Sequence, residues 1–263
     1  MEPYSYAPIQ PKELLMCRFV TNGDQLSAES KTFPAELSPP YNALSYTWAL
    51  TDEGPIMNWD IHTDGRRLPA LASSYPFDEA LRSNGSLLDG TWWWIDSIRI
   101  DQANREERGA HVRRMKHIYH DAHAVVVWLG ERSDDSADAP AFVDFLVELN
   151  ATKPSNEDLH MTLHQEVYRD KWNALRHFFL RKWRTRVWTI QDFAIPEEVT
   201  FWYGTTIIRR DATFAALAMA DRSNAPRFKD SIAFRHWFNR RRAWLLMTMR
   251  GSLTKTSISP SWL

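Results

Sequence analysis

The sequence lacks cysteine pairs, a membrane-spanning run and a secretory signal. It holds a single cysteine, Cys17, among 263 residues, so no disulfide can form within the chain. No apolar run reaches the length of about 20 residues that a membrane-spanning helix needs. The residues before Pro11 lack the basic and then apolar pattern of a secretory signal. We therefore expect a cytoplasmic protein with no membrane span, in which Cys17 is a small buried side chain.

An excess of charge of either sign is also absent. Lys and Arg together number 32 against 33 Asp and Glu, which gives a formal net charge of -1. A balanced chain creates no global field that would attract nucleic acid or an anionic membrane. The short basic run Arg240–Arg242 accompanies no recognition motif, so we predict no nucleic-acid partner.

Complete metal and cofactor motifs are missing as well. Several histidines recur at helical spacing, namely His117, His120 and His123, and then His160 and His164. No cysteine or carboxylate signature completes a zinc site around them. The chain also has no Gly-rich phosphate loop and no Gly-x-Ser-x-Gly nucleophile turn. The sequence thus predicts no metal site and no bound cofactor.

What the chain does contain is a pattern of strands and helices. Apolar and β-branched runs predict strands over 41–48, 92–100, 124–129 and 199–203, and a hairpin over 60–68 that turns at Asp64 and Gly65. Helical periodicity predicts helices over 105–122, 141–149 and 167–180, with shorter ones over 76–81 and 184–193. The strand, helix and strand between 92 and 129 form a βαβ crossover, which indicates a parallel sheet covered by helices.

Three blocks of sequence resemble one known family when they are read together. They run from Pro40 to Trp48, from Trp94 to Gln102 with a continuation to Gly130, and from Arg181 to Gln191. In order and spacing they are similar to the fungal heterokaryon-incompatibility (HET) domain, over a span from Tyr4 to Gly204. The resemblance implies a role in vegetative incompatibility, in which fusion of unlike individuals triggers programmed cell death.

HET domains are in turn distantly similar to Toll-receptor (TIR) domains. That resemblance implies an α/β fold with a TIR-like (flavodoxin-type), mostly parallel sheet flanked by helices, here with helical additions toward the C-terminus. It also implies function through self-association or with other HET- or NLR-type signalling proteins. Since some TIR domains cleave NAD, this dinucleotide is a candidate substrate rather than a cofactor. We expect the HET domain to cover 1–210, followed by a mostly helical extension over 211–263.

The resemblance also points to site residues. Residues 43–48 correspond to the first TIR strand, and Trp188 precedes Asp192 by four positions, as a Trp precedes the catalytic Glu in TIR domains. Asp192 is therefore the candidate catalytic residue, because one carboxylate near the ribose can stabilise an oxocarbenium-like state. The candidate substrate-binding residues, which end predicted strands or adjoin Asp192, are Ser45, Tyr46, Trp48, Asp96, Asp101, Arg186 and Trp188.

Alternatives to catalysis remain open at the level of sequence. Asp192 stands where the family usually has Glu, and a displacement of about 1 Å in a reacting group can lower a rate by roughly 10²-fold. Arg99 and Asp101 replace the usual Cys and Asn, and Ala49 replaces a Gly. The substitutions are compatible with a catalytically silent signalling module, in which Asp192 caps a helix or pairs with a nearby arginine, either Arg181 or Arg186. A later Asp-Pro-Arg-Asp segment of the family is not visible, which indicates a shortened or trimmed member.

Overall fold

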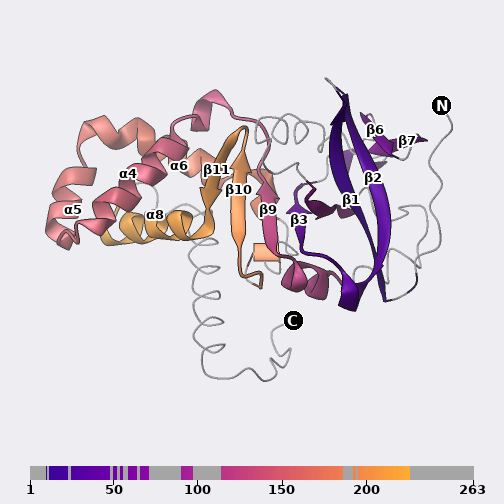
Figure 1. Ribbon diagram of the computed structural model, residues 1–263. Coiled ribbons are helices and arrows are strands. Elements are labelled where there is room, and N and C mark those ends of the chain that lie inside the picture. The colour runs from indigo at the N-terminus through magenta and orange to yellow at the C-terminus, as the bar shows by residue number, and fades with distance from the viewer. Residues whose placement is uncertain are drawn as a thin grey trace.

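The fold is built on one large mixed sheet. The computed structural model describes residues 10, 12–22, 25–47, 50–51, 54–55, 59–63, 66–70, 90–96, 114–185, 192–193 and 195–225. Nine of the described strands form a single sheet in the order β11-β10-β9-β3-β8-β1-β2-β6-β7. Four helices gather at the β11 end of this sheet, at the left in Figure 1, while the hairpin β1-β2 lies toward the other end.

The centre of the sheet consists of four parallel strands. They are β8 (Trp92–Trp94), β3 (Tyr41–Ser45), β9 (Ala124–Trp128) and β10 (Val199–Tyr203). β3 pairs in parallel with β8 on one side and with β9 on the other, and β9 pairs in parallel with β10. Numbered by their position in the chain, the four strands lie in the order 2-1-3-4 across the sheet. The prediction of an α/β fold with a parallel core is therefore confirmed.

Antiparallel strands extend this core on both sides. On one side β1 (Glu13–Asn22) pairs with β8 and with β2 (Gln25–Pro34), and on the other side β11 (Thr206–Arg209) pairs with β10. Beyond β2 lie β6 (Trp59–Thr63), which pairs with β2 in parallel, and β7 (Arg66–Ala70), which pairs with β6 antiparallel. Thr63 is the register partner of Arg66, which confirms the predicted hairpin, while its turn residues Asp64 and Gly65 lie outside the described residues. The pair β4 (Leu50–Thr51) and β5 (Gly54–Pro55) forms a separate small sheet.

The helices follow amphipathic segments of the sequence. They are residues 114–121, α4 (Ala139–Ala151), α5 (Asn156–Leu163), α6 (Arg169–Phe179) and α8 (Arg210–Arg222). Short 3-10 turns occur at η1 (Ala35–Leu37), η4 (Asp134–Ser136), η5 (Glu166–Tyr168) and η6 (Lys182–Thr185). Within the described residues, no helix combines the length and the apolarity that a bilayer crossing requires.

The core lies against the face of the sheet that carries the odd-numbered residues of β3, β9 and β10. Ala43 faces Val125 in the register, and Val125 faces Val199, and all three are at most 3% exposed. The helix over 114–121 covers this face, since the Tyr119 ring meets Trp94 edge-on with ring centroids 5.6 Å apart. The opposite face is also buried where Trp93 packs edge-on against Trp202.

Most of the predicted elements have counterparts in the structure, with some changes in length. The predicted helices over 141–149 and 167–180 correspond to α4 and to η5 with α6, and α8 begins the predicted helical C-terminal part. The strand predicted over 92–100 ends at Trp94, so it is shorter than expected. Of the helix expected over 184–193, the start lies in a 3-10 turn that ends at Thr185, and residues 192 and 193 are helical. The segments 76–81, 186–191 and 226–263 lie outside the described residues.

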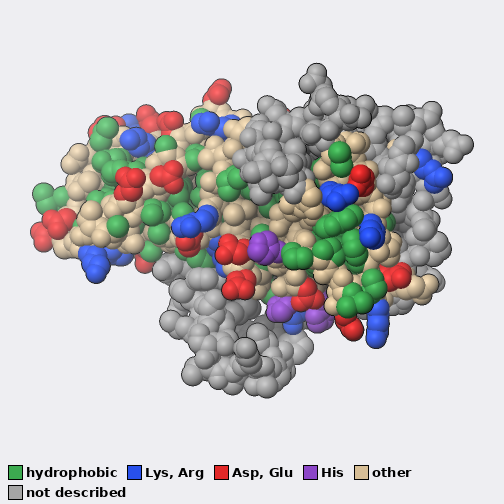
Figure 2. All heavy atoms as spheres, viewed as in Figure 1, with side chains coloured by type: hydrophobic (Ala, Val, Ile, Leu, Met, Phe, Trp, Pro, Cys, Tyr) green, Lys and Arg blue, Asp and Glu red, His purple; other side chains and the backbone are tan. Residues whose placement is uncertain are grey.

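Charged side chains on the visible face are intermingled. In Figure 2 the coloured acidic and basic groups alternate over the helical end of the molecule, at the left, and are interspersed with apolar side chains. This distribution agrees with the balanced composition, so the described surface in this view presents no broad field of one sign.

Candidate functional site at the carboxyl edge of the sheet

The four parallel strands bring their carboxyl ends to one edge of the sheet. In open α/β sheets ligands bind outside this edge, at the point where the strand order reverses. Here the reversal falls between β3 and β9, since the chain places β8 on one side of β3 and β9 on the other. The residues that end β3, β9 and β10 are therefore the first place to look for a site.

A buried polar cluster stands at the end of β3. The Ser45 hydroxyl, on the last residue of the strand, donates a hydrogen bond of 2.7 Å to Oδ2 of Asp192. The indole Nε1 of Trp183, on η6, donates to the same Ser45 oxygen at 2.7 Å. All three residues are buried: Ser45 is 2% exposed, Asp192 is 5% exposed and Trp183 is 1% exposed. We call them the Asp192 cluster.

The Asp192 cluster fixes its carboxylate by hydrogen bonding and by packing. A hydroxyl has one proton to donate and two lone pairs, so Ser45 can donate to Asp192 while it accepts from Trp183. The Trp183 ring is held in turn by the Phe201 ring of β10, at a centroid distance of 6.0 Å. A buried carboxylate is costly unless it is hydrogen-bonded, and the bond from Ser45 meets part of that need. The arrangement joins the first and third of the sequence blocks.

A buried arginine anchors the chain that follows Asp192. Arg210, at the start of α8, donates to the carbonyl oxygens of Phe193 at 2.9 Å, Pro196 at 2.8 Å and Glu197 at 2.6 Å. Burial lowers the pKa of the Arg210 guanidinium to about 10, although the charges of two nearby carboxylates act in the opposite direction. Because α8 thereby holds three carbonyl groups just after Asp192, it contributes to the placement of the carboxylate.

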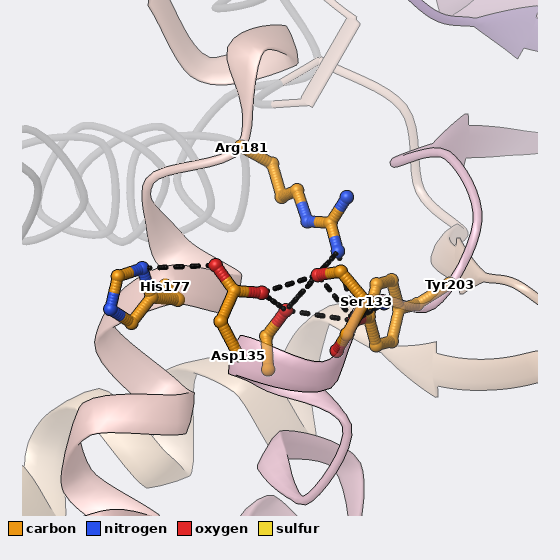
Figure 3. A network of polar contacts seen from close by, with 6 residues as sticks. Ser133, Asp135, His177, Arg181 and Tyr203 are labelled. Carbon is orange, nitrogen blue, oxygen red and sulfur yellow. Dashed lines mark hydrogen bonds and ion pairs between the residues drawn. The ribbon is translucent and has the colours of Figure 1, made fainter.

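A second polar cluster stands at the ends of β9 and β10. Nη2 of Arg181 donates to the hydroxyls of Ser133 at 2.5 Å, Ser136 at 3.1 Å and Tyr203 at 2.9 Å (Figure 3). The guanidinium carbon also lies 4.8 Å from the centroid of the Tyr203 ring, within the range of a cation–π contact. With Asp135, which accepts hydrogen bonds from both serine hydroxyls, these residues form what we call the Arg181 cluster.

The contacts within the Arg181 cluster shift the pKa of two of its acids. The hydrogen bond from Ser133 lowers the pKa of the Asp135 carboxyl, and with Ser136, His177 and Arg181, which act in the same direction, it outweighs the opposing effect of burial. Burial alone would raise the pKa of the Tyr203 phenol, but its bonds with the two serines and the charge of Arg181 bring the pKa below its usual value. Nδ1 of His177, on α6, lies 3.3 Å from Oδ2 of Asp135, at the outer side of the cluster (Figure 3).

The predicted site residues fall into two groups. Ser45 and Asp192 are in direct contact, while Tyr46 is buried beside Ser45 in the chain and Asp96 is half-buried just after β8, at the same edge. The remaining predicted residues lie outside the described residues, and they are Trp48, Asp101, Arg186 and Trp188. The alternative partner Arg181 directs its hydrogen bonds to the hydroxyls of its own cluster.

Several residues of the two clusters were not predicted. Trp183 lies within the third sequence block, so its position there was the one available signal. Nothing local marked Arg210, Ser133 or Tyr203, because their partners are distant in the chain.

The histidines His160 and His164 both direct a ring nitrogen to the Ser223 carbonyl oxygen, at 3.2 and 2.8 Å. Among the described residues, no group of three or more potential ligands is arranged to hold a metal ion.

Comparison with known proteins adds a family to this geometry. A family model described as heterokaryon incompatibility protein (HET) matches residues 41–192. Heterokaryon incompatibility protein 6, OR allele, of Neurospora crassa is 30% identical over 210 residues, which cover 67% of this chain and 31% of that protein. Vegetative incompatibility protein HET-E-1 of Podospora anserina is 27% identical over 175 residues, or 65% of this chain and 10% of that protein.

The matched region contains both ends of the Asp192 cluster, since it begins at β3 and closes at Asp192 itself. The chain spans less than a third of the length of either relative. No solved structure matches it. On the family match and the identity to the Neurospora protein, the chain belongs to the heterokaryon incompatibility (HET) family.

Proposed function

We propose that this chain is a HET-domain effector of fungal non-self recognition and programmed cell death, and that it hydrolyses NAD at the Asp192 cluster. Both relatives are named for incompatibility, which supports the biological role. The effector acts in the cytoplasm, through self-association or with other HET- or NLR-type signalling proteins. We assign the HET domain to 1–210 and a C-terminal extension to 211–263, of which the residues up to Ala225 are described; in α8, Phe214 meets Phe193 edge-on, which supports packing of this part on the domain.

The observation that carries the catalytic proposal is the hydrogen bond between Ser45 and Asp192. It joins residues 147 positions apart in the chain and sets a carboxylate at the carboxyl end of β3. The 2-1-3-4 order of the parallel strands is the beginning of the flavodoxin-type order, in which the ligand crevice opens beside the first strand. The strand order supports a TIR-like arrangement of the core.

The chemistry requires one well-placed carboxylate. Cleavage breaks the bond between the ribose C1′ and the pyridinium nitrogen, and the bonding electron pair leaves with nicotinamide, which is neutral after release. The Asp192 carboxylate stabilises the oxocarbenium-like ribose, and a water molecule attacks C1′ and gives up its proton. The products are nicotinamide, ADP-ribose and one proton. Ser45 and Trp183 act by positioning the carboxylate.

A catalytically silent signalling module of the same fold is the second candidate. It is favoured by the burial of Asp192, which is 5% exposed and engaged by Ser45, since a buried and bonded carboxylate can serve the fold alone. The side chain is also one methylene shorter than the Glu of the family. In this alternative the Asp192 cluster locks the third sequence block onto β3, and signalling proceeds through association.

Incubation with NAD separates the two candidates. Nicotinamide release is measured at high protein concentration for the wild type, Asp192→Asn and Asp192→Glu, with Asp211→Asn as the control because Asp211 lies on the surface, where its side chain is 64% exposed and pairs with Arg209. We expect turnover by the wild type and the control, loss in Asp192→Asn, and an equal or higher rate in Asp192→Glu. Absence of turnover in every form would leave the silent module as the function.

A further inference from the structure

Toward the described residues, the Arg181 guanidinium donates hydrogen bonds through one of its three nitrogens. All three hydrogen bonds to the cluster hydroxyls come from Nη2. To the described residues, Nε and Nη1 donate no hydrogen bond, and no carboxylate forms an ion pair with Arg181. The side chain is half-buried, and the Asp135 carboxylate acts on its charge through the shared serine hydroxyls without forming a direct ion pair. Such a group is a receptor for an anion from outside.

Gly130 places no side chain beside the unused nitrogen Nη1 of Arg181. This residue follows β9 by two positions and has a φ of 92°, and a Cβ atom there would lie 4.0 Å from Nη1. In Figure 3 the dashed contacts of Arg181 come from one nitrogen, and the other two guanidinium nitrogens take no part in them. Of these two, Nη1 lies beside Gly130, just after the carboxyl end of β9.

We propose that Arg181, with the hydroxyls of Ser133, Ser136 and Tyr203, binds the phosphate groups of a nucleotide ligand. Guanidinium N–H groups match phosphate oxygens in charge and geometry, and hydroxyl groups can turn to donate to the same oxygens. Where the ligand is NAD, an assignment that rests on the proposed function, the bound group is the diphosphate.

The placement of the two clusters agrees with one extended ligand. Arg181 and Trp183 are two residues apart, and they contact the ends of β10 and β3 respectively, through Tyr203 and Ser45. The Arg181 and Asp192 clusters therefore follow each other along one sheet edge, which allows phosphate at the first and ribose at the second. Asp135 opposes the anion, because its carboxylate is bound to the same two serine hydroxyls.

Calorimetric titration of the whole chain tests the phosphate site. The probes are ADP-ribose, inorganic pyrophosphate and adenosine, none of which requires turnover. We expect Arg181→Gln to weaken ADP-ribose and pyrophosphate at least about tenfold, the loss that follows from one charge-assisted contact, with no change for adenosine. Asp135→Asn should tighten both phosphate ligands. Arg209→Gln, which alters an arginine that is 73% exposed, is the matched control.

Each outcome bears on the proposal. Unchanged binding in Arg181→Gln, or no binding of either phosphate ligand by the wild type, overturns it. If Arg181→Gln fails to fold, Asp135→Asn decides, since a purely structural network would lose stability without gaining affinity. Cleavage of NAD with no effect of Arg181 on binding refutes the phosphate site alone. Pyrophosphate binding through Arg181 without any cleavage of NAD refutes the proposed hydrolysis alone.

Discussion

The Asp192 and Arg181 clusters stand at the same sheet edge but differ in how they are completed. Ser45, Trp183 and Asp192 are almost fully buried, and each contributes a hydrogen bond within the protein. Arg181 is half-buried and keeps donors that no described residue uses. The difference teaches that one edge can combine a group held rigidly by packing with a group that remains available to a ligand. In the proposed site, the first would set the geometry and the second would supply affinity.

The largest expected effect on stability comes from a change that breaks the Asp192 cluster. Trp183→Ala removes a buried ring that packs on Phe201 and donates to Ser45, so we expect a loss of about 3–5 kcal/mol in the free energy of unfolding. Trp183→Phe keeps most of the packing and removes the donor, so its loss should be near 1 kcal/mol, roughly that of one hydrogen bond. Urea unfolding measures both. Equal losses in the two variants would show that the ring itself contributes little.

A smaller loss in the free energy of unfolding is expected where Arg210 of α8 anchors the chain after Asp192. Arg210→Ala leaves the carbonyl groups of Phe193, Pro196 and Glu197 without their donor, which we expect to cost about 3 kcal/mol. The neighbouring change Arg209→Ala removes an exposed ion pair with Asp211 and should cost less than about 1 kcal/mol. Thermal unfolding of the two variants measures the contrast, and a similar shift in both would mean that Arg210 does not hold this segment.

The smallest expected effect on stability concerns the charge of Asp135 in the Arg181 cluster. The folded-state pKa of Asp135 lies below the ordinary value of 3.8, so its ionisation contributes stability above that pH, and the contribution is lost as the pH falls through the depressed pKa. Because the carboxylate is 55% exposed, the contribution should stay below about 1 kcal/mol. Asp135→Asn should therefore be slightly less stable than the wild type at neutral pH and equal to it in strong acid. A difference that persists in acid would assign the effect to packing.

The fold was predictable where one segment carries its own periodicity. The run Ala124–Trp128 is continuous and apolar, and it became a central strand, while the helical spacing in 169–179 became α6. The hairpin Glu13–Pro34 was not predicted, because its second strand, Gln25–Pro34, mixes small and polar residues that pair only through the first. The strand at Trp92 ended earlier than its aromatic composition indicated.

The site was predictable only in part. The resemblance to the HET family singled out Ser45 and Asp192, which the structure joins, but it gave no reason to choose Trp183 as their partner. The contact between Trp183 and Ser45 spans 138 positions and that between Arg181 and Ser133 spans 48. Contacts of this kind depend on how the strands are ordered in the sheet, and no local pattern in the sequence encodes that order.

A crystal structure of the chain with ADP-ribose tests most directly whether the two clusters form one site. We predict that the terminal ribose lies beside the Asp192 carboxylate and the diphosphate on the Nε and Nη1 side of Arg181. A ligand bound at another place, or one whose ribose lies far from Asp192, would contradict a single site formed by the two clusters.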